Sequence, residues 1–352
     1  MTATRYRVVQ WATGNIGRRA LREVIRHPGL DLVGVLVFDP AKDGVDAGDL
    51  CGERPIGVPA TTDRAAARGL GADCVLYMPR RLGLEDIVAL LESGANVVTT
   101  RGELFAHGHN LGDEGRSEVI AACERGDSSI YATGSSPGFI TDALPLALLS
   151  MQRRVESLEF EEFANLSRRD SPGLLFELMG FGRPLDSFDP GGAATHLLGE
   201  FQPSLATLAE AADVAVDEWT CRGEVAVARH DTTILAGEIP AGTLAGQRTS
   251  ILGRRGGVDV MRFTPTWYCT EELDPVWDLR ATGWRVRVRG DAPFDIELAF
   301  PIPRDDLAAF TPAYTANRPV NAIPYVCAAA PGILATEDLP PITPAGPRLR
   351  GD

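Results

Sequence analysis

Apolar and polar positions along residues 1–135 follow two alternating patterns, which predict strands and helices in turn. Short β-branched runs predict buried strands, and the amphipathic stretches between them predict helices. The expected strands are Tyr6–Trp11, Leu30–Phe38, Ala72–Met78, Asn96–Thr100 and Ser129–Ala132. The expected helices are Ile16–His27, Leu84–Ser93 and Ser117–Arg125. Strands joined by helices pair in parallel through right-handed crossovers, so this half is predicted to be an α/β, doubly wound Rossmann sheet.

The pattern changes near Thr141. Val155–Phe163 alternates apolar and acidic residues, as a strand with one face in water does. Helices are expected at Pro172–Phe181 and Thr195–Ala212, and long antiparallel strands between Val214 and Pro301, most clearly Val258–Cys269 and Trp284–Phe300, with turns at Gly253–Gly257 and Gly290–Pro293. This part is predicted to be an α+β domain with an open, largely antiparallel sheet. Because an open sheet needs its other face covered, we expect a homo-oligomer.

A chain of 352 residues exceeds the size of most single cores, so we expect more than one domain. Residues 1–140 are assigned to a dinucleotide-binding Rossmann domain and residues 141–308 to a substrate-binding and dimerisation domain. Residues 309–352, helix-like around Val320–Ala330, are expected to pack back on the Rossmann domain.

Charge and composition exclude several classes of function. The formal net charge of −14 repels nucleic acid and anionic membranes, and no apolar run is long enough to span a bilayer. Polar residues precede the first strand, so we expect no signal peptide and a cytoplasmic protein. The six cysteines form no CxxC pair, and His107 and His109 are expected to be loop residues, not metal ligands. We therefore expect no metal site.

The first predicted strand runs directly into a turn of small residues and then into a helix, which indicates a dinucleotide site. Small residues let the backbone approach a pyrophosphate, whose charge then lies on N–H groups at the helix start. Ala12 stands where the fingerprint has its first glycine, which alanine can occupy if its φ is negative. The residues expected to form this site are Ala12, Thr13, Gly14, Asn15, Ile16, Gly17 and Arg18.

The end of the second predicted strand bears on the choice between NAD and NADP. Asp39 follows Gly17 by 22 residues, close to the offset of an acidic residue that binds the adenosine ribose. Arg18, Arg19 and Lys42 are near enough in sequence to hold a 2′-phosphate instead. The sequence leaves both cofactors open.

Three further loops follow the carboxyl ends of predicted strands, where ligands bind in this fold. They are expected to surround the nicotinamide through Met78, Pro79, Thr100, Gly134 and Ser136. Glu103 is the carboxylate beside that position. In a closed apolar cleft its pKa would rise and it could serve as an acid or base near neutral pH. The alternative is a structural Glu at a helix start, stabilised by the helix dipole.

Six motifs together resemble the native amine dehydrogenases, a group that includes 2,4-diaminopentanoate dehydrogenase and is related to dihydrodipicolinate reductase. They are WATGNIG, FDPAKDGVDAGDL, VVTTRGELF, ATGSSPGF, LLFELMGFG and RPVNAIPYVCAAAPGI, spread over nearly the whole chain. Two features depart from these groups: the amine dehydrogenases usually have WGTGNIG at the turn, and no histidine–lysine run like that of dihydrodipicolinate reductase occurs between residues 141 and 300.

The resemblance implies a homodimeric, NAD(P)-dependent enzyme that deaminates a small amine or aminates a ketone or aldehyde with ammonia. It also implies that Glu103 is the catalytic carboxylate. Phe139, Leu178, Met179 and Phe181 are expected to line an apolar substrate pocket, unless they form ordinary core. Arg168, Arg169 or Arg183 could hold a substrate carboxylate, although each could equally be a solvated surface residue. A reductase that needs no ammonia and a dinucleotide sensor without turnover remain alternatives.

Overall fold

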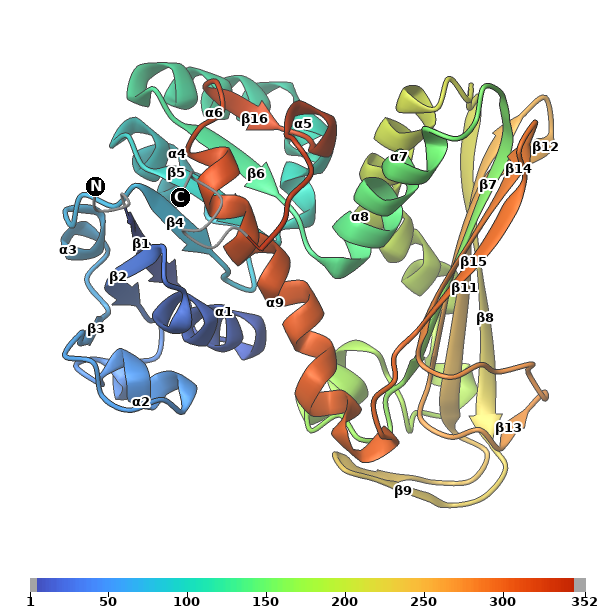
Figure 1. Ribbon diagram of the computed structural model, residues 1–352. Coiled ribbons are helices and arrows are strands. Elements are labelled where there is room, and N and C mark those ends of the chain that lie inside the picture. Colours follow the sequence, from blue (N-terminus) through green and yellow to red (C-terminus); the bar gives the residue numbers. More distant parts are fainter. Residues whose placement is uncertain (1–4, 345–352) are drawn as a thin grey trace. The chain divides into compact units, whose positions relative to one another are not determined.

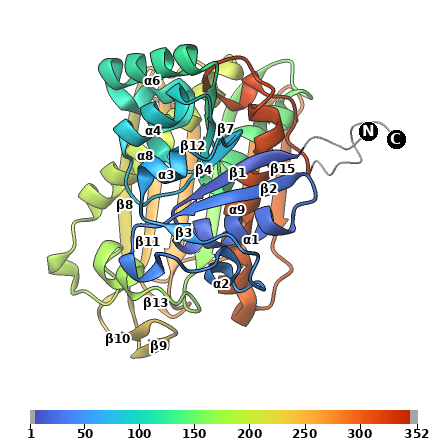
Figure 2. The same ribbon diagram turned by 90° about the vertical axis from the view of Figure 1, so that its left-hand side faces the viewer.

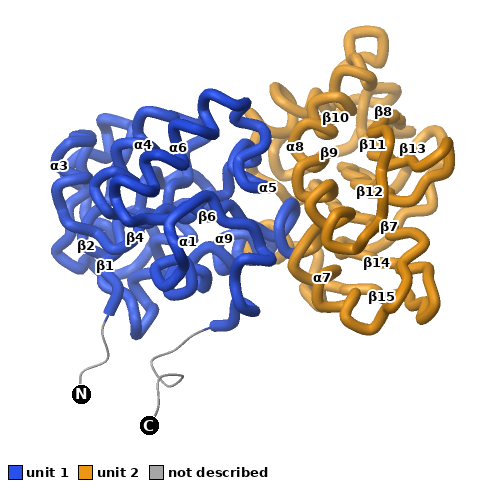
Figure 3. Tube along the Cα trace, turned by 90° about the horizontal axis from the view of Figure 1, so that it is seen from above, with its two compact units in different colours: residues 1–139, 311–352 blue, residues 140–310 orange. Residues whose placement is uncertain are grey.

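The computed structural model describes residues 5–344 of the chain. They form two compact units, shown in blue and orange in Figure 3. Unit 1 comprises residues 1–139 and 311–352, and unit 2 comprises residues 140–310. Unit 1 is thus built from both ends of the chain. In the described range, no helix is long and apolar enough to cross a membrane.

Unit 1 is a parallel seven-stranded sheet with the strand order β16-β6-β5-β4-β1-β2-β3 (Figure 1). Its strands are β1 (Tyr6–Trp11), β2 (Leu30–Leu36), β3 (Ala60–Thr61), β4 (Cys74–Tyr77), β5 (Asn96–Thr99), β6 (Ser129–Ala132) and β16 (Gly332–Leu334). The order reverses between β1 and β4, the position at which doubly wound sheets bind ligands. The Rossmann fold predicted from the sequence is confirmed.

Helices cover both faces of this sheet, because its strands are apolar on both sides. They are α1 (Asn15–Arg26), α2 (Ala47–Cys51), α3 (Arg64–Arg68), α4 (Leu84–Glu92), α5 (Phe105–Gly108), α6 (Gly112–Gly126) and α9 (Leu307–Val326). Apolar residues of α4 and α6 pack in the cluster on one face, and α1 and α9 contribute to the cluster on the other. Figure 2 shows the strands β1, β2 and β4 from the side.

The C-terminal part of unit 1 is α9 followed by β16, which pairs with β6 in parallel. α9 contains Pro312, Pro319 and Pro324 and is longer than the helix expected around residues 320–330. Prolines interrupt the helical hydrogen-bond ladder. Buried contacts of Ala316, Val320 and Ile323 with the sheet hold the helix in place.

Unit 2 is a second seven-stranded sheet with the order β13-β8-β11-β12-β7-β14-β15. These strands are β7 (Val155–Asn165), β8 (Glu218–Ala228), β11 (Leu244–Arg255), β12 (Val258–Tyr268), β13 (Leu273–Asp274), β14 (Gly283–Gly290) and β15 (Phe294–Ala299), beside a hairpin of β9 (Thr232–Ile234) and β10 (Gly237–Ile239). All neighbours in the seven-stranded sheet are antiparallel except β12 and β7. The open, largely antiparallel sheet is confirmed.

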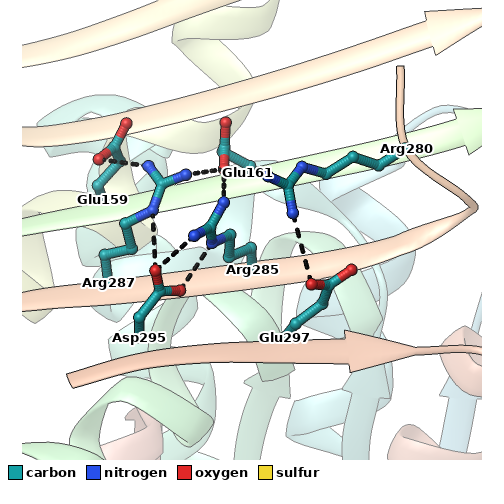
Figure 4. A network of polar contacts seen from close by, with 7 residues as sticks. All are labelled: Glu159, Glu161, Arg280, Arg285, Arg287, Asp295 and Glu297. Carbon is teal, nitrogen blue, oxygen red and sulfur yellow. Dashed lines mark hydrogen bonds and ion pairs between the residues drawn. The ribbon is translucent and has the colours of Figure 1, made fainter. Parts of the chain in front are cut away.

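The two faces of this sheet differ in chemistry. Phe160 and Phe263 pack on one face with residues of the helix α8 (Pro190–Ala211). The ring centres of Phe263 and of Phe201 in α8 lie 4.5 Å apart. The short helix α7 (Leu144–Leu149) also belongs to this unit. The residues between the core positions of β7 carry charge instead. Arg287 bonds Glu159 at 2.7 Å and Glu161 at 2.6 Å in the network of Figure 4. The residues of this network are paired charges, and the expectation of a homodimer stays a prediction.

Local differences from the sequence prediction have physical causes. The helix expected at Pro172–Phe181 is one short turn, η5 (Gly173–Leu178), because Gly180 and Gly182 turn the chain at φ values of +75° and +78°. The helix expected to start at Ser117 begins at Gly112, with Asp113 and Glu114 favourably placed in its first turn.

Candidate active site

The turn between β1 and α1 leaves backbone N–H groups available at the start of a helix. The amide of Ala12 bonds Leu36 O at 2.9 Å, and that of Met78 bonds Trp11 O at 2.9 Å, so the turn is fixed to both neighbouring strands. In this part of the described chain, Gly14 occupies the N-cap without a side-chain cap, and the first turn of α1 has no acidic residue. The first N–H groups of a helix have no intrahelical partner, and they favour anions. This helix start is therefore suited to a phosphate group.

Two glycines of the turn are required for different reasons. A Cβ on Gly17 would lie 2.2 Å from Ala12 O, so α1 can approach the turn only if this residue is glycine. A Cβ on Gly14 would meet nothing within 4 Å. No neighbouring protein atom requires glycine at position 14, which is the situation expected where a ligand approaches the backbone.

Ala12 adopts a left-handed backbone conformation with a φ of +79°. The condition under which alanine was expected to fit this position, a negative φ, is therefore not met. The amide Nε2 of the buried Gln10 donates to Ala12 O at 2.9 Å and fixes the following peptide. A left-handed L-residue costs roughly 1–2 kcal/mol, so this turn is strained.

The residues after β2 gather near the same turn. Lys42 Nζ lies 3.4 Å from Thr13 Oγ1, which brings a cation to the turn between β1 and α1. Asp39 is exposed, and its carboxylate accepts from the amide of Ala41 at 3.0 Å at the start of the short helix η1 (Pro40–Lys42). Arg18 is exposed on α1. An acidic side chain suited to ribose hydroxyls and a basic side chain suited to a phosphate thus both lie at this strand end.

Glu103 lies in the short helix η2 (Gly102–Leu104) that follows β5, and it forms an ion pair. Arg101 Nη2 is 2.5 Å from Glu103 Oε1, and Arg101 Nε is 3.1 Å from Oε2. Arg101 also donates to Arg80 O at 2.7 Å, which links this loop to the one after β4. The expectation of a carboxylate in purely apolar surroundings is wrong, because a guanidinium holds both of its oxygens. The two side chains remain 21% and 30% exposed.

The other residues expected near the cofactor lie in the loops after β4, β5 and β6. Met78 is buried against the cluster that contains α1 and α9, while Pro79 and Thr100 are half-buried. Gly134 is buried and Ser136 half-buried in the loop after β6, where η4 (Ser135–Ala143) begins with extended backbone. Ser136 Oγ is a buried hydroxyl without a hydrogen-bond partner in the described chain.

The four residues expected to line the substrate pocket belong to two different units. Phe139 belongs to unit 1 and is half-buried, with Arg318 Cζ 5.8 Å from the centre of its ring. In unit 2, Leu178 is 59% exposed, and the carbonyl of the half-buried Met179 accepts from Gln247. Phe181 is 1% exposed and packs in the unit 2 core, so its ring has no face open to a substrate in this structure.

The three arginines expected to be able to bind a substrate carboxylate differ in their partners and in their burial. Arg168 is paired with Asp305 at 2.8 Å, and Arg183 donates to Glu177 O at 3.2 Å. Arg169 is half-buried, and burial lowers its pKa from the ordinary value while Glu162 acts in the opposite sense.

The buried cysteines Cys123 and Cys269 are poor nucleophiles near neutral pH. Burial raises the pKa of Cys123 to about 11 and that of Cys269 to about 12, so neither supplies a thiolate nucleophile near neutral pH. His107 lies 2.9 Å from Asp338. No group of three or more His, Cys, Asp or Glu residues in the described part of the chain is arranged to hold a metal ion.

Sequence reasoning missed two residues of α9 that contact the loop after β6. Thr315 Oγ1 lies 2.7 Å from Ser135 Oγ, and Arg318 Nε lies 2.8 Å from Thr133 Oγ1. Arg318 begins the motif RPVNAIPYVCAAAPGI, whose prolines are untypical of a long helix. Spacing along the sequence does not indicate partners about 180 positions away.

The fold and the β1–α1 turn together define a Rossmann-type protein with an uncapped helix start that is suited to an anion. Residues 139–346 match the family model of the 2,4-diaminopentanoate dehydrogenase C-terminal domain. The chain is 31% identical to an amine dehydrogenase of Streptomyces virginiae, over 97% of this chain and 98% of that protein. The chain therefore belongs to the family of 2,4-diaminopentanoate dehydrogenase and the amine dehydrogenases, and it is an oxidoreductase.

Solved structures show the same fold at lower sequence identity. The amine dehydrogenase of Mycobacterium smegmatis superposes with a TM-score of 0.77 at 20% identity, covering 97% of this chain and 98% of that one. Biliverdin reductase of Synechocystis superposes with a TM-score of 0.51 at 11% identity, covering 95% and 94%.

The strain at Ala12 predicts that Ala12→Gly stabilises the protein. Glycine adopts a positive φ without a steric penalty, and this gain exceeds the entropy that glycine adds to the unfolded chain, so we expect the free energy of unfolding to rise by about 1 kcal/mol. Ala20→Gly, in the middle of α1, is the control and should lower it by about 1 kcal/mol. Urea titration measures both, and equal destabilisation by the two substitutions would contradict a strained turn.

Proposed function

We propose that this oxidoreductase binds NAD or NADP on unit 1 and catalyses the reversible oxidative deamination of a small amine. In the reverse direction a ketone or aldehyde is aminated with ammonia. The observation that carries the proposal is the β1–α1 turn, with its uncapped helix start and its open approach at Gly14. Family membership supports the amine as the substrate class.

The residues present fit a nicotinamide dinucleotide. The N–H groups at the start of α1 would bind the pyrophosphate, and a Cβ on Gly14 would fill the approach to them. Lys42 and Asp39 would contact the adenosine ribose. Lys42 favours the 2′-phosphate of NADP, and Asp39 favours the free ribose hydroxyls of NAD. The loops after β4, β5 and β6 would receive the nicotinamide. NAD appears in the name of one structural neighbour, a protein of gentamicin A biosynthesis, and NADP+ in that of biliverdin reductase.

The bound nicotinamide supplies the chemistry that gives or takes a hydride at the substrate carbon. In amination, ammonia adds to the carbonyl carbon and water leaves, which produces an iminium cation. We propose that the Glu103 carboxylate carries the protons for these steps and stabilises the cation. Arg101 would act as a positioning residue, since its fork fixes the plane of that carboxylate. The amine nitrogen would compete with Arg101 for the same oxygens.

The substrate pocket and the homodimer belong to the same proposal. Phe139 and Met179 are half-buried and Leu178 is exposed, so these three remain candidates for the apolar wall. Substrate size is left open. A homodimer is supported by the family resemblance alone.

The function is tested with a panel of amines and carbonyl compounds, read by NAD(P)H absorbance. Carbonyl reduction should require ammonium, and amine oxidation should proceed without it. Turnover of carbonyls that is independent of ammonium would establish instead a reductase of C=O, C=N or C=C bonds. Cofactor binding with no turnover of any compound would favour a dinucleotide sensor.

Glu103→Gln should abolish amine turnover without affecting the cofactor. Loss of a general acid–base typically lowers the rate by about 10²–10⁴-fold, while the Kd for NAD(P)H should remain unchanged. Glu114→Gln, at an exposed position in the first turn of α6, is the matched control and should keep full activity. If Glu103→Gln turns over amines at nearly the wild-type rate, Glu103 has a structural role in its ion pair and no catalytic role.

Gly14→Ala should separate ligand binding from folding. No protein atom lies near the added methyl group, so the free energy of unfolding should fall by no more than about 1 kcal/mol, the usual preference for glycine over alanine at an N-cap. If the pyrophosphate lies against this backbone, the affinity for NAD(P)H should fall by about tenfold or more, equivalent to about 1.4 kcal/mol. Gly17→Ala is the comparison, because its methyl group collides with Ala12 O and should reduce stability as well. Unchanged cofactor affinity in Gly14→Ala would contradict the assignment.

A further inference from the structure

The loop after β6 has a backbone that depends on two glycines. Gly138 has a φ of +119°, in a region that side chains strongly disfavour. A Cβ on Gly134 would lie 3.1 Å from Pro137 O and 3.5 Å from the Thr315 methyl group. The loop is therefore folded tightly on itself and packed against α9. It follows β6, on the side of the sheet that would receive the nicotinamide.

Two side chains of α9 hold this loop through hydrogen bonds. Thr315 Oγ1 lies 2.7 Å from Ser135 Oγ. Arg318 donates from Nε to Thr133 Oγ1 at 2.8 Å and from Nη2 to Tyr131 at 3.4 Å. Its guanidinium also lies over the ring of Phe139, with 5.8 Å between Cζ and the ring centre. The contacts of Arg318 thus extend from the end of β6 to the last residue of the loop.

The helix that carries these side chains is itself anchored in the core. Ala316, Val320 and Ile323, which flank Thr315 and Arg318 in sequence, are almost completely buried against the unit 1 sheet. Side chains presented from such a packed surface hold their partners more firmly than side chains on loops do. α9 therefore offers the loop a rigid support from a distant part of the sequence.

The hydrogen-bond and ring partners of Arg318 are neutral groups. They are the hydroxyls of Thr133 and Tyr131 and the ring of Phe139, and no carboxylate of the described chain forms an ion pair with the guanidinium. A cation without a carboxylate partner beside a ligand loop favours an anionic ligand such as a dinucleotide. Arg125, by contrast, is neutralised by Glu92 at 2.5 Å.

We propose that Thr315 and Arg318 are positioning residues for the cofactor: they fix residues 133–139 in the shape that accepts the nicotinamide half. The inference rests on the proposed function, since it presumes a nicotinamide dinucleotide. It goes further by assigning a role to α9 in the second, C-terminal segment of unit 1. It also separates two halves of the cofactor site, one supported by α1 and the other by α9.

The test compares the complete cofactor with a fragment that lacks nicotinamide. Binding of NAD(P)H, and of ADP-ribose or its 2′-phosphate, is measured by calorimetry for the wild type, Arg318→Met and Thr315→Val. We expect Arg318→Met to raise the Kd for NAD(P)H on the order of tenfold, the effect of losing a hydrogen bond of a charged group, with a smaller rise for Thr315→Val. The Kd for the fragment should stay within about twofold of the wild-type value, well below the tenfold step of 1.4 kcal/mol.

Two control variants and a kinetic measurement make the outcome decisive. Arg125→Met removes an arginine of unit 1 that lies at the end of α6, before β6 begins, and pairs with Glu92 at the end of α4; it should leave both Kd values unchanged. Arg318→Lys keeps the charge but not the planar fork, and should restore only part of the affinity. With active protein, the KM for the cofactor should rise more than kcat falls.

Equal loss of NAD(P)H and fragment binding in Arg318→Met and Thr315→Val would show a general structural role and overturn the inference. Unchanged affinity for both ligands would overturn it as well. A wild-type protein that binds neither ligand would refute the proposed function itself, whereas selective loss of NAD(P)H binding supports the inference even if amines are not the substrate.

Discussion

Unit 1 depends on the close approach of α1 to the turn that precedes it. Gly17 has no side chain, so the helix backbone lies against Ala12 O, and Gln10 holds the same carbonyl from the strand side. This contact directs the first N–H groups of α1 toward the carboxyl edge of the sheet. The strained φ of Ala12 is maintained because both of its neighbours are fixed. Every functional assignment in unit 1 begins from this geometry.

The parts of the fold with local signals could be predicted from the sequence. Tyr6–Trp11 and Ser129–Ala132 are strands with the expected bounds. Where strands and helices alternate, a short apolar run between turn residues predicts a buried strand. The glycine turn and the acidic residue after the second strand also identified the Rossmann fold. Residues 172–181 were predicted wrongly, because apolar periodicity does not show that glycines at 180 and 182 reverse the chain.

Charge partners were much harder to predict than elements. Glu103 was identified by its place after a strand, but its ion pair with Arg101 was not, although only two positions separate them. Side-chain geometry decides whether such neighbours meet. The contacts of α9 are the more distant case: Thr315 and Arg318 reach residues about 180 positions earlier, through packing that no sequence spacing encodes. The same holds for the charged face of unit 2. The alternation of apolar and acidic residues in β7 predicted a solvent-exposed face, but not the pairing of Arg287 with Glu159 and Glu161.

The central claim is that the first turn of α1 binds the pyrophosphate of a nicotinamide dinucleotide. Hydrogen–deuterium exchange of the wild-type protein, with and without NAD(P)H, tests it most directly, because the amides of Asn15 and Ile16 have no intrahelical acceptor and should exchange fast in the free protein. The account predicts that the cofactor slows exchange in the peptide that spans these residues. Cofactor binding that leaves the exchange of this peptide unchanged would contradict it.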